Sequence, residues 1–426
     1  MNSIAINSST KKTSIEWVVL IFIALCSLLT GVVPQTLLSF FVLLACFVLF
    51  FIGKLFAAYP FMIFYYEMYG KLLGLSVYRI FSLLFLLSVL MRINTKKRVK
   101  ISIFVPAGIY FLYCLFVMTN YSTQRAVFSF VDVICSILIV SETISKDKDK
   151  MKFFFKIYVL VCFVAFVSGA IGANATNYEM AGVEMSRFQA TFEDPNYMGF
   201  FYTIGIFSML TLKLFSKAPT IILTIALYAI VFSSLSVTAF LLNVILWMLY
   251  LFVFQKKSLK TFLAFLLMLV AVLGLYNYGI KNPQTTIIGP LTTRIEEKLV
   301  QASEGDIGNA TTGRTNLTQA HIEYFESLPL SKKLFGGTAV NFSVIDPAVE
   351  GAAHNEYVDM LLNIGILGTT VIIFWVLFKL LHHCKEYQRT KDEIYMCTIM
   401  NNCIWLAYAA SLTIFLDYRF MLPFFL

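Results

Sequence analysis

The longest polar stretch of the chain runs from Tyr278 to His354; it begins YGIKNPQTTI and ends PAVEGAAH. It interrupts a 426-residue sequence dominated by apolar runs, and a new apolar run begins at Tyr357. In a bilayer protein the residues of the spanning helices are chosen mainly for contact with lipid. A long ordered loop on one side is therefore the natural place for chemistry. We therefore expect the functional site in or beside this stretch.

The composition defines the class of protein. The chain is 59% hydrophobic and 13% charged, whereas a soluble globular domain carries roughly 25% charged residues. These values indicate an all-α, polytopic membrane protein. The formal net charge of +9 fits lysines and arginines that face anionic lipid headgroups. No basic patch with interleaved aromatic residues lies outside the apolar runs, so a nucleic-acid partner is not expected.

A spanning helix needs about 20 apolar residues, and we predict a bundle of about 12–14 spans with a large, partly helical outer loop. The weakest candidate, 55–70, carries Pro60 and Glu67, and the alternative for it is a re-entrant or interfacial segment. It is counted because the orientation of the other spans requires a crossing there. The predicted spans are 17–33, 36–53, 55–70, 73–91, 101–119, 126–143, 153–172, 196–214, 219–235, 237–254, 261–279, 357–381 and 394–416.

Clusters of Lys and Arg set the orientation, since cytoplasmic loops carry an excess of these residues. The clusters lie near 96–100, 146–152, 256–260 and 385–391. Placing them inside puts the loops 173–195 and 280–355 outside. The predicted organisation is N-terminal membrane helices (1–172), central membrane helices with the short outer loop 173–195 (173–279), a large outer or periplasmic loop (280–355) and C-terminal membrane helices (356–426).

Two helices are expected within the large outer loop. The second runs from about Gly313 to Leu328 and places Arg314 and His321 on one face at helical spacing. The first, Thr292–Ser303, is expected to expose its charged side chains, which are Arg294, Glu296, Glu297 and Lys298.

Two arginines at these outer loops are candidate anion ligands. Arg187 precedes the turn Asp194-Pro195-Asn196. Arg314 sits at an expected helix N-terminus, where free N–H groups and the positive end of the dipole gather. A guanidinium group offers a fork of donors that fits phosphate or carboxylate. The alternatives are a snorkelling interfacial anchor for Arg187 and a solvated loop residue for Arg314.

His354 is the candidate general base. It lies where the outer loop re-enters the membrane, and an imidazole can take a proton near neutral pH. The alternative is an ordinary polar helix start. His321 competes for the role, but its position on the second loop helix favours packing.

Other polar residues complete the candidate site. Asp132, inside a predicted span, needs a partner such as Arg79 or Arg125, and a structural ion pair is favoured over a proton relay. No Gly-rich phosphate loop, nucleophile elbow or metal signature is present, so no cofactor and no metal are expected. The further expected substrate contacts are Glu193, Asn196, Asn355 and Arg294.

Several motifs follow one another along the chain: Arg187 with Asp194-Pro195-Asn196, Gly313-Arg314, Pro329, Gly336-Gly337, His354-Asn355-Glu356-Tyr357 and Asn363-Ile364-Gly365-Ile366-Leu367-Gly368. Taken in order, these motifs resemble the O-antigen ligase and polymerase family. The resemblance covers roughly Arg187 to Leu381. It implies a GT-C-like glycosyltransferase that moves a glycan from undecaprenyl diphosphate to an acceptor hydroxyl at the outer face of the bacterial inner membrane. Arg187 and Arg314 would hold the diphosphate, and His354 would act on the hydroxyl.

Three functions and a purely structural role in the membrane are open at this point. A polymerase would join oligosaccharide repeat units of an O-antigen or capsular polysaccharide, and it is favoured. A ligase would move finished polymer to an acceptor such as the lipid A core of lipopolysaccharide. A flippase or other transporter would show internal two-fold symmetry, which the sequence lacks. The expected partners are undecaprenyl-diphosphate-linked glycans as donor and acceptor, the lipid bilayer and a chain-length regulator.

Overall fold

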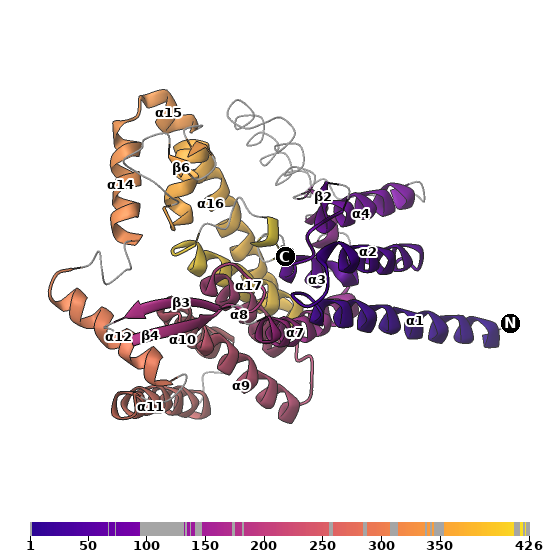
Figure 1. The fold of residues 1–426 in the computed structure, drawn as a ribbon, viewed down its shortest axis with the longest axis horizontal. Coiled ribbons are helices and arrows are strands. Elements are labelled where there is room, and N and C mark those ends of the chain that lie inside the picture. The colour runs from indigo at the N-terminus through magenta and orange to yellow at the C-terminus, as the bar shows by residue number, and fades with distance from the viewer. Residues whose placement is uncertain are drawn as a thin grey trace.

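Most of the chain is described by a computed structural model, and it is mostly helical (Figure 1). The predicted span 101–119 and Arg125 lie outside the described residues. The residues that the structure describes are 2–66, 68–72, 74–93, 132, 134–136, 138–140, 147–172, 175–180, 183–254, 259–283, 288–306, 314–336, 339–340, 343–344, 353–412, 418–420 and 422.

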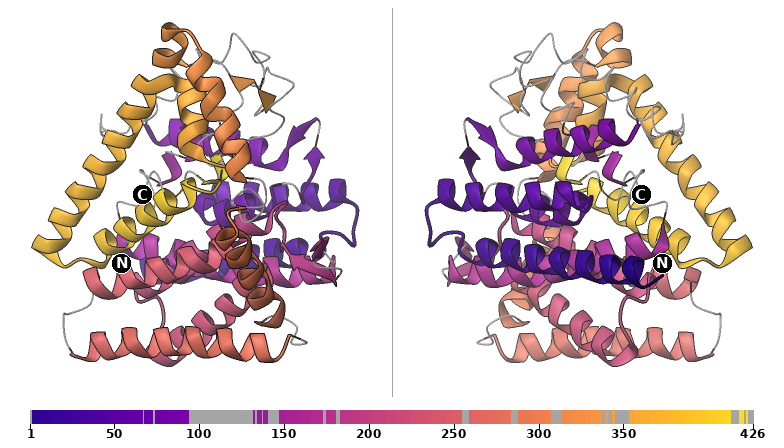
Figure 2. Two further views of the ribbon diagram at one scale, coloured as in Figure 1. Left: turned by 90° about the vertical axis from the view of Figure 1, so that its left-hand side faces the viewer. Right: turned by 90° about the vertical axis from the view of Figure 1, so that its right-hand side faces the viewer.

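Apolar helices make up the body of the molecule. Among the described residues, α7 (Lys148–Ile171) and α16 (Glu356–Thr390) are long and apolar enough to cross a membrane, and shorter apolar helices accompany them. Figure 2 shows α16 slanting along one edge of the molecule. The other long helices are α1 (Asn2–Leu28), α2 (Gln35–Phe51), α4 (Val77–Ile93), α8 (Pro195–Thr211), α9 (Lys217–Ser233), α10 (Val237–Leu249), α11 (Leu259–Lys281) and α17 (Glu393–Ala409).

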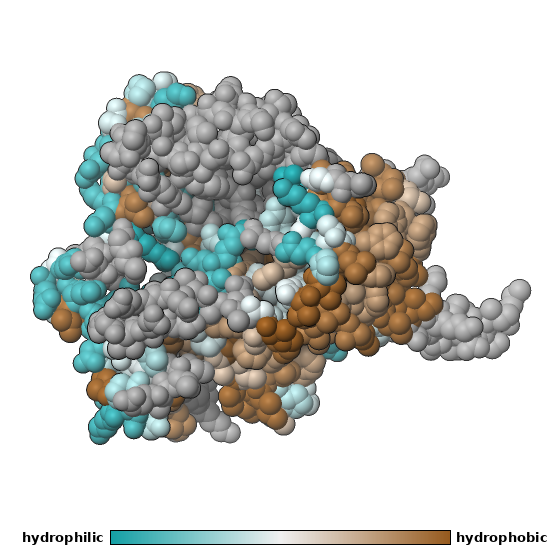
Figure 3. All heavy atoms as spheres, in the orientation of Figure 1, coloured by the Kyte–Doolittle hydropathy of each residue, from teal (hydrophilic) through white to brown (hydrophobic). Residues whose placement is uncertain are grey.

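The polar elements gather on the side away from the N-terminus (Figure 1). Hydrophilic side chains cover this side, and hydrophobic side chains cover the region of α2 and α4 (Figure 3). We call it the polar end. Its elements are the hairpin β3 (Ala175–Met180) and β4 (Val183–Phe188), α12 (Ile288–Ser303), α14 (Arg314–Ser327), α15 (Leu330–Phe335) and the short pair β5 (Ala339–Val340) and β6 (Ser343–Val344).

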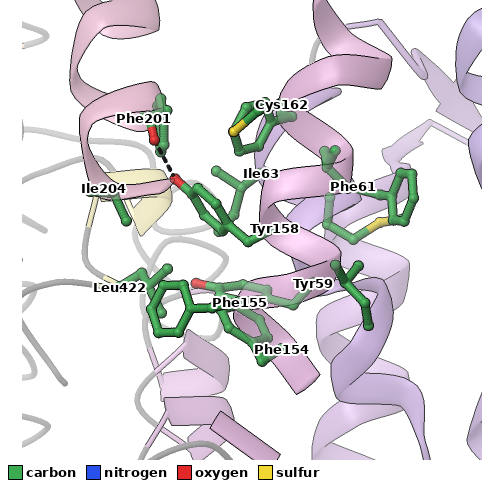
Figure 4. Close-up of a cluster of buried hydrophobic side chains, with 14 of the residues drawn as sticks. Tyr59, Phe61, Ile63, Phe154, Phe155, Tyr158, Cys162, Phe201, Ile204 and Leu422 are labelled. Carbon is green, nitrogen blue, oxygen red and sulfur yellow. Dashed lines mark hydrogen bonds between the residues drawn. The ribbon is translucent and has the colours of Figure 1, made fainter. Parts of the chain in front are cut away.

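The core is aromatic and centres on α7 and α8. Tyr158 is fully buried, and its hydroxyl donates to the carbonyl of Phe201 at 3.1 Å (Figure 4). Phe192, just before α8, stacks on Phe201 with ring centroids 4.8 Å apart. Nearly every residue of α8 is buried. This helix therefore anchors the loop that precedes it, including Asp194.

The stretch 55–70 is not one continuous helix, contrary to the simplest form of the prediction. It contains a 3-10 turn (η1, Leu55–Ala58) and a short helix (α3, Tyr59–Phe64), and the strand pair β1 (Lys71–Leu72) and β2 (Leu75–Ser76) follows it. Lys54 follows the end of α2, whereas Gly70 packs against Gln35 at its start. The broken stretch thus runs the full length of α2. Irregular backbone is tolerated at membrane depth where protein covers it, and both η1 and α3 are buried.

Ion pairs lie at the other end of α7, α8 and α17. Glu393 is 3.0 Å from Lys152, 3.0 Å from Lys213 and 3.3 Å from Lys148. These residues belong to the start of α7, the end of α8 and the start of α17, so the polar end is at the far end of the same helices.

Asp132 has the partner that the sequence predicted. It is 2% exposed, and its carboxylate lies 3.9 Å from the Arg79 guanidinium group. The structural pairing with Arg79 is therefore confirmed.

Candidate active site

Two corners of the chain meet at the polar end. In the first, Asp194 caps α8 by accepting a hydrogen bond from the backbone N–H of Asn196 at 2.6 Å. The second corner joins α9 to α10, and its Ser236 donates to Oδ1 of Asn196 at 2.5 Å. Asn196 is 4% exposed, so it holds the two corners together. Its predicted contact with substrate stays a prediction.

Two arginines bind successive carbonyls of the α9–α10 corner. Arg187, in β4, donates from Nε to the carbonyl of Ser234 at 3.0 Å. Arg294, in α12, donates from Nη1 to the carbonyl of Leu235 at 3.0 Å. The expectation that Arg294 is exposed is wrong. It is 8% exposed, because its guanidinium group reaches a main-chain acceptor inside the molecule.

Arg314 and Lys298 join these two arginines. Arg314 begins α14 and donates from Nη1 to the carbonyl of Ser411 at 3.3 Å. Lys298 follows Arg294 by one turn of α12. It is half-buried rather than exposed as expected. Burial and the neighbouring charges of Arg294, Arg314 and Arg187 lower the pKa of Lys298 to about 8.

We call these four residues, Arg187, Arg294, Lys298 and Arg314, the cation cluster. They come from β4 and from two helices much later in the sequence, α12 and α14. Four positive side chains in one place repel one another, so the arrangement suits a multiply charged anion.

His354 lies beside the cluster at the start of α16. Thr318 of α14 donates to the carbonyl of Ala353 at 2.9 Å and so fixes the residue before the histidine. Burial, and next the charge of Arg314, lower the pKa of His354; His321 acts in the same direction and Asp194 opposes them. The imidazole is therefore neutral at neutral pH, which is the form that accepts a proton.

His321 packs inside the molecule. It is 1% exposed, and its Nδ1 donates to the carbonyl of Leu317 at 2.7 Å. A carbonyl can only accept, so this nitrogen carries the hydrogen. The predicted packing role of His321 is confirmed, and the catalytic role of His354 stays a prediction.

The remaining predicted contacts occupy the edges of the site. Glu193 is exposed in the turn before α8. Asn355 caps α16, its side chain accepting from the backbone N–H of Tyr357 at 3.1 Å. This cap orients the stretch that carries His354.

Strained backbone also gathers here. Ala190, Leu235 and His354 have positive φ angles of 51°, 50° and 52°. Such conformations cost roughly 1–3 kcal/mol each and persist where the surroundings enforce them, often at functional sites. Ala190 follows the strand of Arg187, Leu235 supplies the carbonyl bound by Arg294, and His354 is the candidate base.

An apolar groove runs from between the helices to α12, the helix that carries Arg294 and Lys298. A cavity of about 590 Å³ lies between α9, α10 and α11, and a second of about 120 Å³ lies beside α12. Phe232 and Phe240 line both, so we treat them as one groove. It reaches Ile295, the neighbour of Arg294. The groove therefore places an apolar surface next to concentrated positive charge.

Three polar side chains in the wall of the groove, Tyr228, Asn243 and Trp247, are hydrogen-bonded to each other. The Tyr228 hydroxyl accepts from Trp247 Nε1 at 2.6 Å and donates to Asn243 Oδ1 at 3.0 Å. Because these three side chains bond to each other, they need no water, and the groove can hold an apolar chain.

Lys298, the hairpin and the groove were not anticipated from the sequence. The spacing of Lys298 four residues after Arg294 was the available signal, because residues i and i+4 share a helix face. For the hairpin, the signal was a two-residue gap containing Gly182 between two runs of six residues. A groove between helices has no local sequence signal.

These features indicate a helical membrane protein with a cluster of basic side chains at one end of the bundle. Residues 221–373 match the family described as O-antigen ligase, and the resemblance to the O-antigen ligase and polymerase family is thereby confirmed. The matched region contains Arg294, Lys298, Arg314, His354 and the groove, whereas Arg187 precedes it. No curated protein matches the chain. No solved structure matches it either.

Proposed function

We propose that this protein is a glycosyltransferase of the bacterial cytoplasmic membrane that takes its glycan from undecaprenyl diphosphate. In this proposal it works as a polymerase that joins oligosaccharide repeat units at the outer face. The observation that carries the proposal is the junction of the cation cluster with the apolar groove. A lipid diphosphate has the same two parts, a long apolar chain and a compact anionic head, in the same order.

The cluster explains how the donor can react without a nucleotide. The bond between the sugar and the diphosphate breaks with its electron pair on the phosphate oxygen. Arg187, Arg294 and Arg314 remain charged at all relevant pH values and can stabilise that developing charge. A lipid diphosphate is already a good leaving group, so the chain needs to supply only charge and orientation.

The acceptor hydroxyl must lose a proton while its oxygen attacks the sugar. His354 is neutral and lies near Arg314, so it can take that proton beside the departing phosphate. Thr318 and Asn355 hold the backbone on either side of it. In this scheme the arginines bind the donor and His354 serves the acceptor.

A ligase is the second candidate, because the matched family carries that description. The two functions differ in the acceptor. In a strain without the protein, single repeat units on the lipid core would indicate a lost polymerase. Long polymer accumulating on undecaprenyl diphosphate would indicate a lost ligase, and an unchanged glycan profile would count against both.

The proposal also requires the polar end to face outward. Ser303 is exposed at the end of α12. In a variant without native cysteines, Ser303→Cys should react with a membrane-impermeant thiol reagent in intact cells whose outer barrier is permeabilised. If labelling occurs only after the cytoplasmic membrane is disrupted, the polar end faces inward, and an enzyme acting at the outer face is ruled out.

A further inference from the structure

We propose that Lys298 is a fourth ligand of the diphosphate and that it responds to the change in phosphate charge during glycan transfer. This inference rests on the proposed function, because it assigns a role within the same site. It adds a residue that the family resemblance did not include and that sequence reasoning treated as a solvated surface lysine.

The position of Lys298 supports a ligand role. Residues 294 and 298 are one turn apart, so their side chains lie on the same face of α12. Arg294 is buried on that face against the α9–α10 corner. Lys298 is half-buried and lies within electrostatic range of Arg314 on α14 and Arg187 on β4. Its ammonium group therefore belongs to a cluster formed by three separate elements.

Lys298 differs chemically from its three neighbours. Guanidinium groups stay protonated, whereas the pKa of Lys298 is lowered to about 8 by burial, Arg294, Arg314 and Arg187. Asp194, Tyr197 and His354 lie within electrostatic range of Arg314. An added phosphate anion favours the ammonium form, so the pKa of Lys298 should rise when the diphosphate binds.

The reaction itself changes the phosphate charge. In the donor, the phosphate next to the sugar is linked on both sides. Transfer breaks the sugar–oxygen bond, forms the bond to the acceptor oxygen and passes the acceptor proton to His354. The released lipid diphosphate then ends in a terminal phosphate that carries up to two negative charges near neutral pH. A protonated Lys298 stabilises this product-like charge more than it stabilises the donor.

The test measures binding rather than turnover. Purified protein in lipid nanodiscs is titrated with undecaprenyl diphosphate, and with undecaprenyl monophosphate for comparison, between pH 7.5 and pH 9.5. The apparent affinity of the native protein for the diphosphate should fall roughly ten-fold as Lys298 of the unliganded protein loses its proton. The fall should begin near pH 8, because only the ammonium form binds the phosphate.

Two substitutions separate charge from titration. Lys298→Arg keeps the charge at all these pH values, so its affinity should stay nearly constant to pH 9.5. Lys298→Met should bind roughly ten-fold more weakly already at pH 7.5, with a flat pH dependence. Lys332→Met, on exposed α15, is the matched control and should behave as the native protein. Elution as a single species shows that each variant is folded.

The outcomes distinguish this inference from the proposed function. If the native protein binds the diphosphate and Lys298→Met binds it equally well, Lys298 is not a ligand. If Lys298→Arg shows the same fall with pH as the native protein, another group titrates and the inference is wrong. Failure of the native protein to bind undecaprenyl diphosphate would overturn the proposed function, and the role of Lys298 with it.

Discussion

Gly336 and Gly365 pack backbone against backbone at the joint between α15 and the break in α16. Their φ angles are +74° and +68°, in the region that favours glycine. A methyl group at position 336 would come within 2.5 Å of the Gly365 nitrogen, and one at position 365 within 2.6 Å of the Gly336 nitrogen. The joint docks the outer helices onto α16, and so it sets Arg314 of α14 relative to His354.

Gly365→Ala should therefore destabilise the protein. Both the strained φ and the close contact oppose a side chain, and overpacking costs about 1–3 kcal/mol. The midpoint of thermal unfolding of detergent-solubilised protein measures the effect. Gly274→Ala is the control, since a methyl group there meets nothing within 4 Å. Equal midpoints for the two variants would argue against a rigid joint.

Arg187→Lys and Arg314→Lys should each lower transfer activity, because a point charge does not replace the guanidinium fork. We expect a loss of roughly ten-fold or more in kcat/KM at equal protein level, in line with a lost charge-assisted hydrogen bond. Arg389→Lys provides the comparison. Arg389 is exposed and pairs with Glu386 at 2.6 Å on α16, away from the cluster. Full activity in both cluster variants would show that Arg187 and Arg314 do not bind the donor.

His354→Ala should leave the protein inserted and folded but reduce turnover by about 10²–10⁴-fold, the usual effect of losing a general base. His321→Ala should mainly lower stability, because it removes a buried side chain and its bond to the Leu317 carbonyl. Turnover per folded molecule separates the two effects. An active His354→Ala variant beside an inactive, stable His321→Ala variant would assign the base to His321.

In a plot of kcat/KM against pH, the fall in rate on the acid side should lie below pH 6.5, the ordinary pKa of histidine. We call this fall the acid limb. Burial and Arg314 lower the pKa of His354, so the base stays neutral, and active, to lower pH than a free imidazole would. Arg314→Gln removes a repulsive charge, so it should move the acid limb to higher pH as well as weakening donor binding. An unshifted limb in that variant would mean that another group controls it.

Filling the groove should discriminate against long lipids. Ala229 and Ala271 line the larger cavity, so Ala229→Trp or Ala271→Trp should raise KM for an undecaprenyl donor by roughly ten-fold, the value of about two buried methylene groups. A donor with a short prenyl chain should be affected less. Leu267→Trp, at a position on α11 that is 68% exposed, is the control. Equal effects on both donors would place the lipid elsewhere.

Much of the architecture could be predicted because apolar length and basic clusters report directly on membrane helices. The same reasoning placed Arg187 and Arg314 on one side, and the structure has both beside Lys298. Hydropathy could not predict the break within 55–70, since a broken stretch and a continuous helix need the same apolar residues when protein surrounds them.

The burial of Arg294 and Lys298 and the lowered pKa of Lys298 depend on contacts that only the fold creates. On an isolated helix both read as solvated charges, and local sequence contains nothing of the α9–α10 corner, which lies about 60 residues earlier along the chain. His321 was easier, since its position on the apolar stripe of the helix already indicated packing.

The acceptors that hold Arg187 and Arg294 are the main-chain oxygens of Ser234 and Leu235. Every amino acid supplies such an oxygen, so the side chains at these two positions can be exchanged without removing either acceptor. What must persist is the left-handed turn at Leu235, a conformation that asparagine or glycine adopts with less strain. The side chains of the corner can therefore change while its two carbonyl oxygens still hold Arg187 and Arg294 at the same spacing.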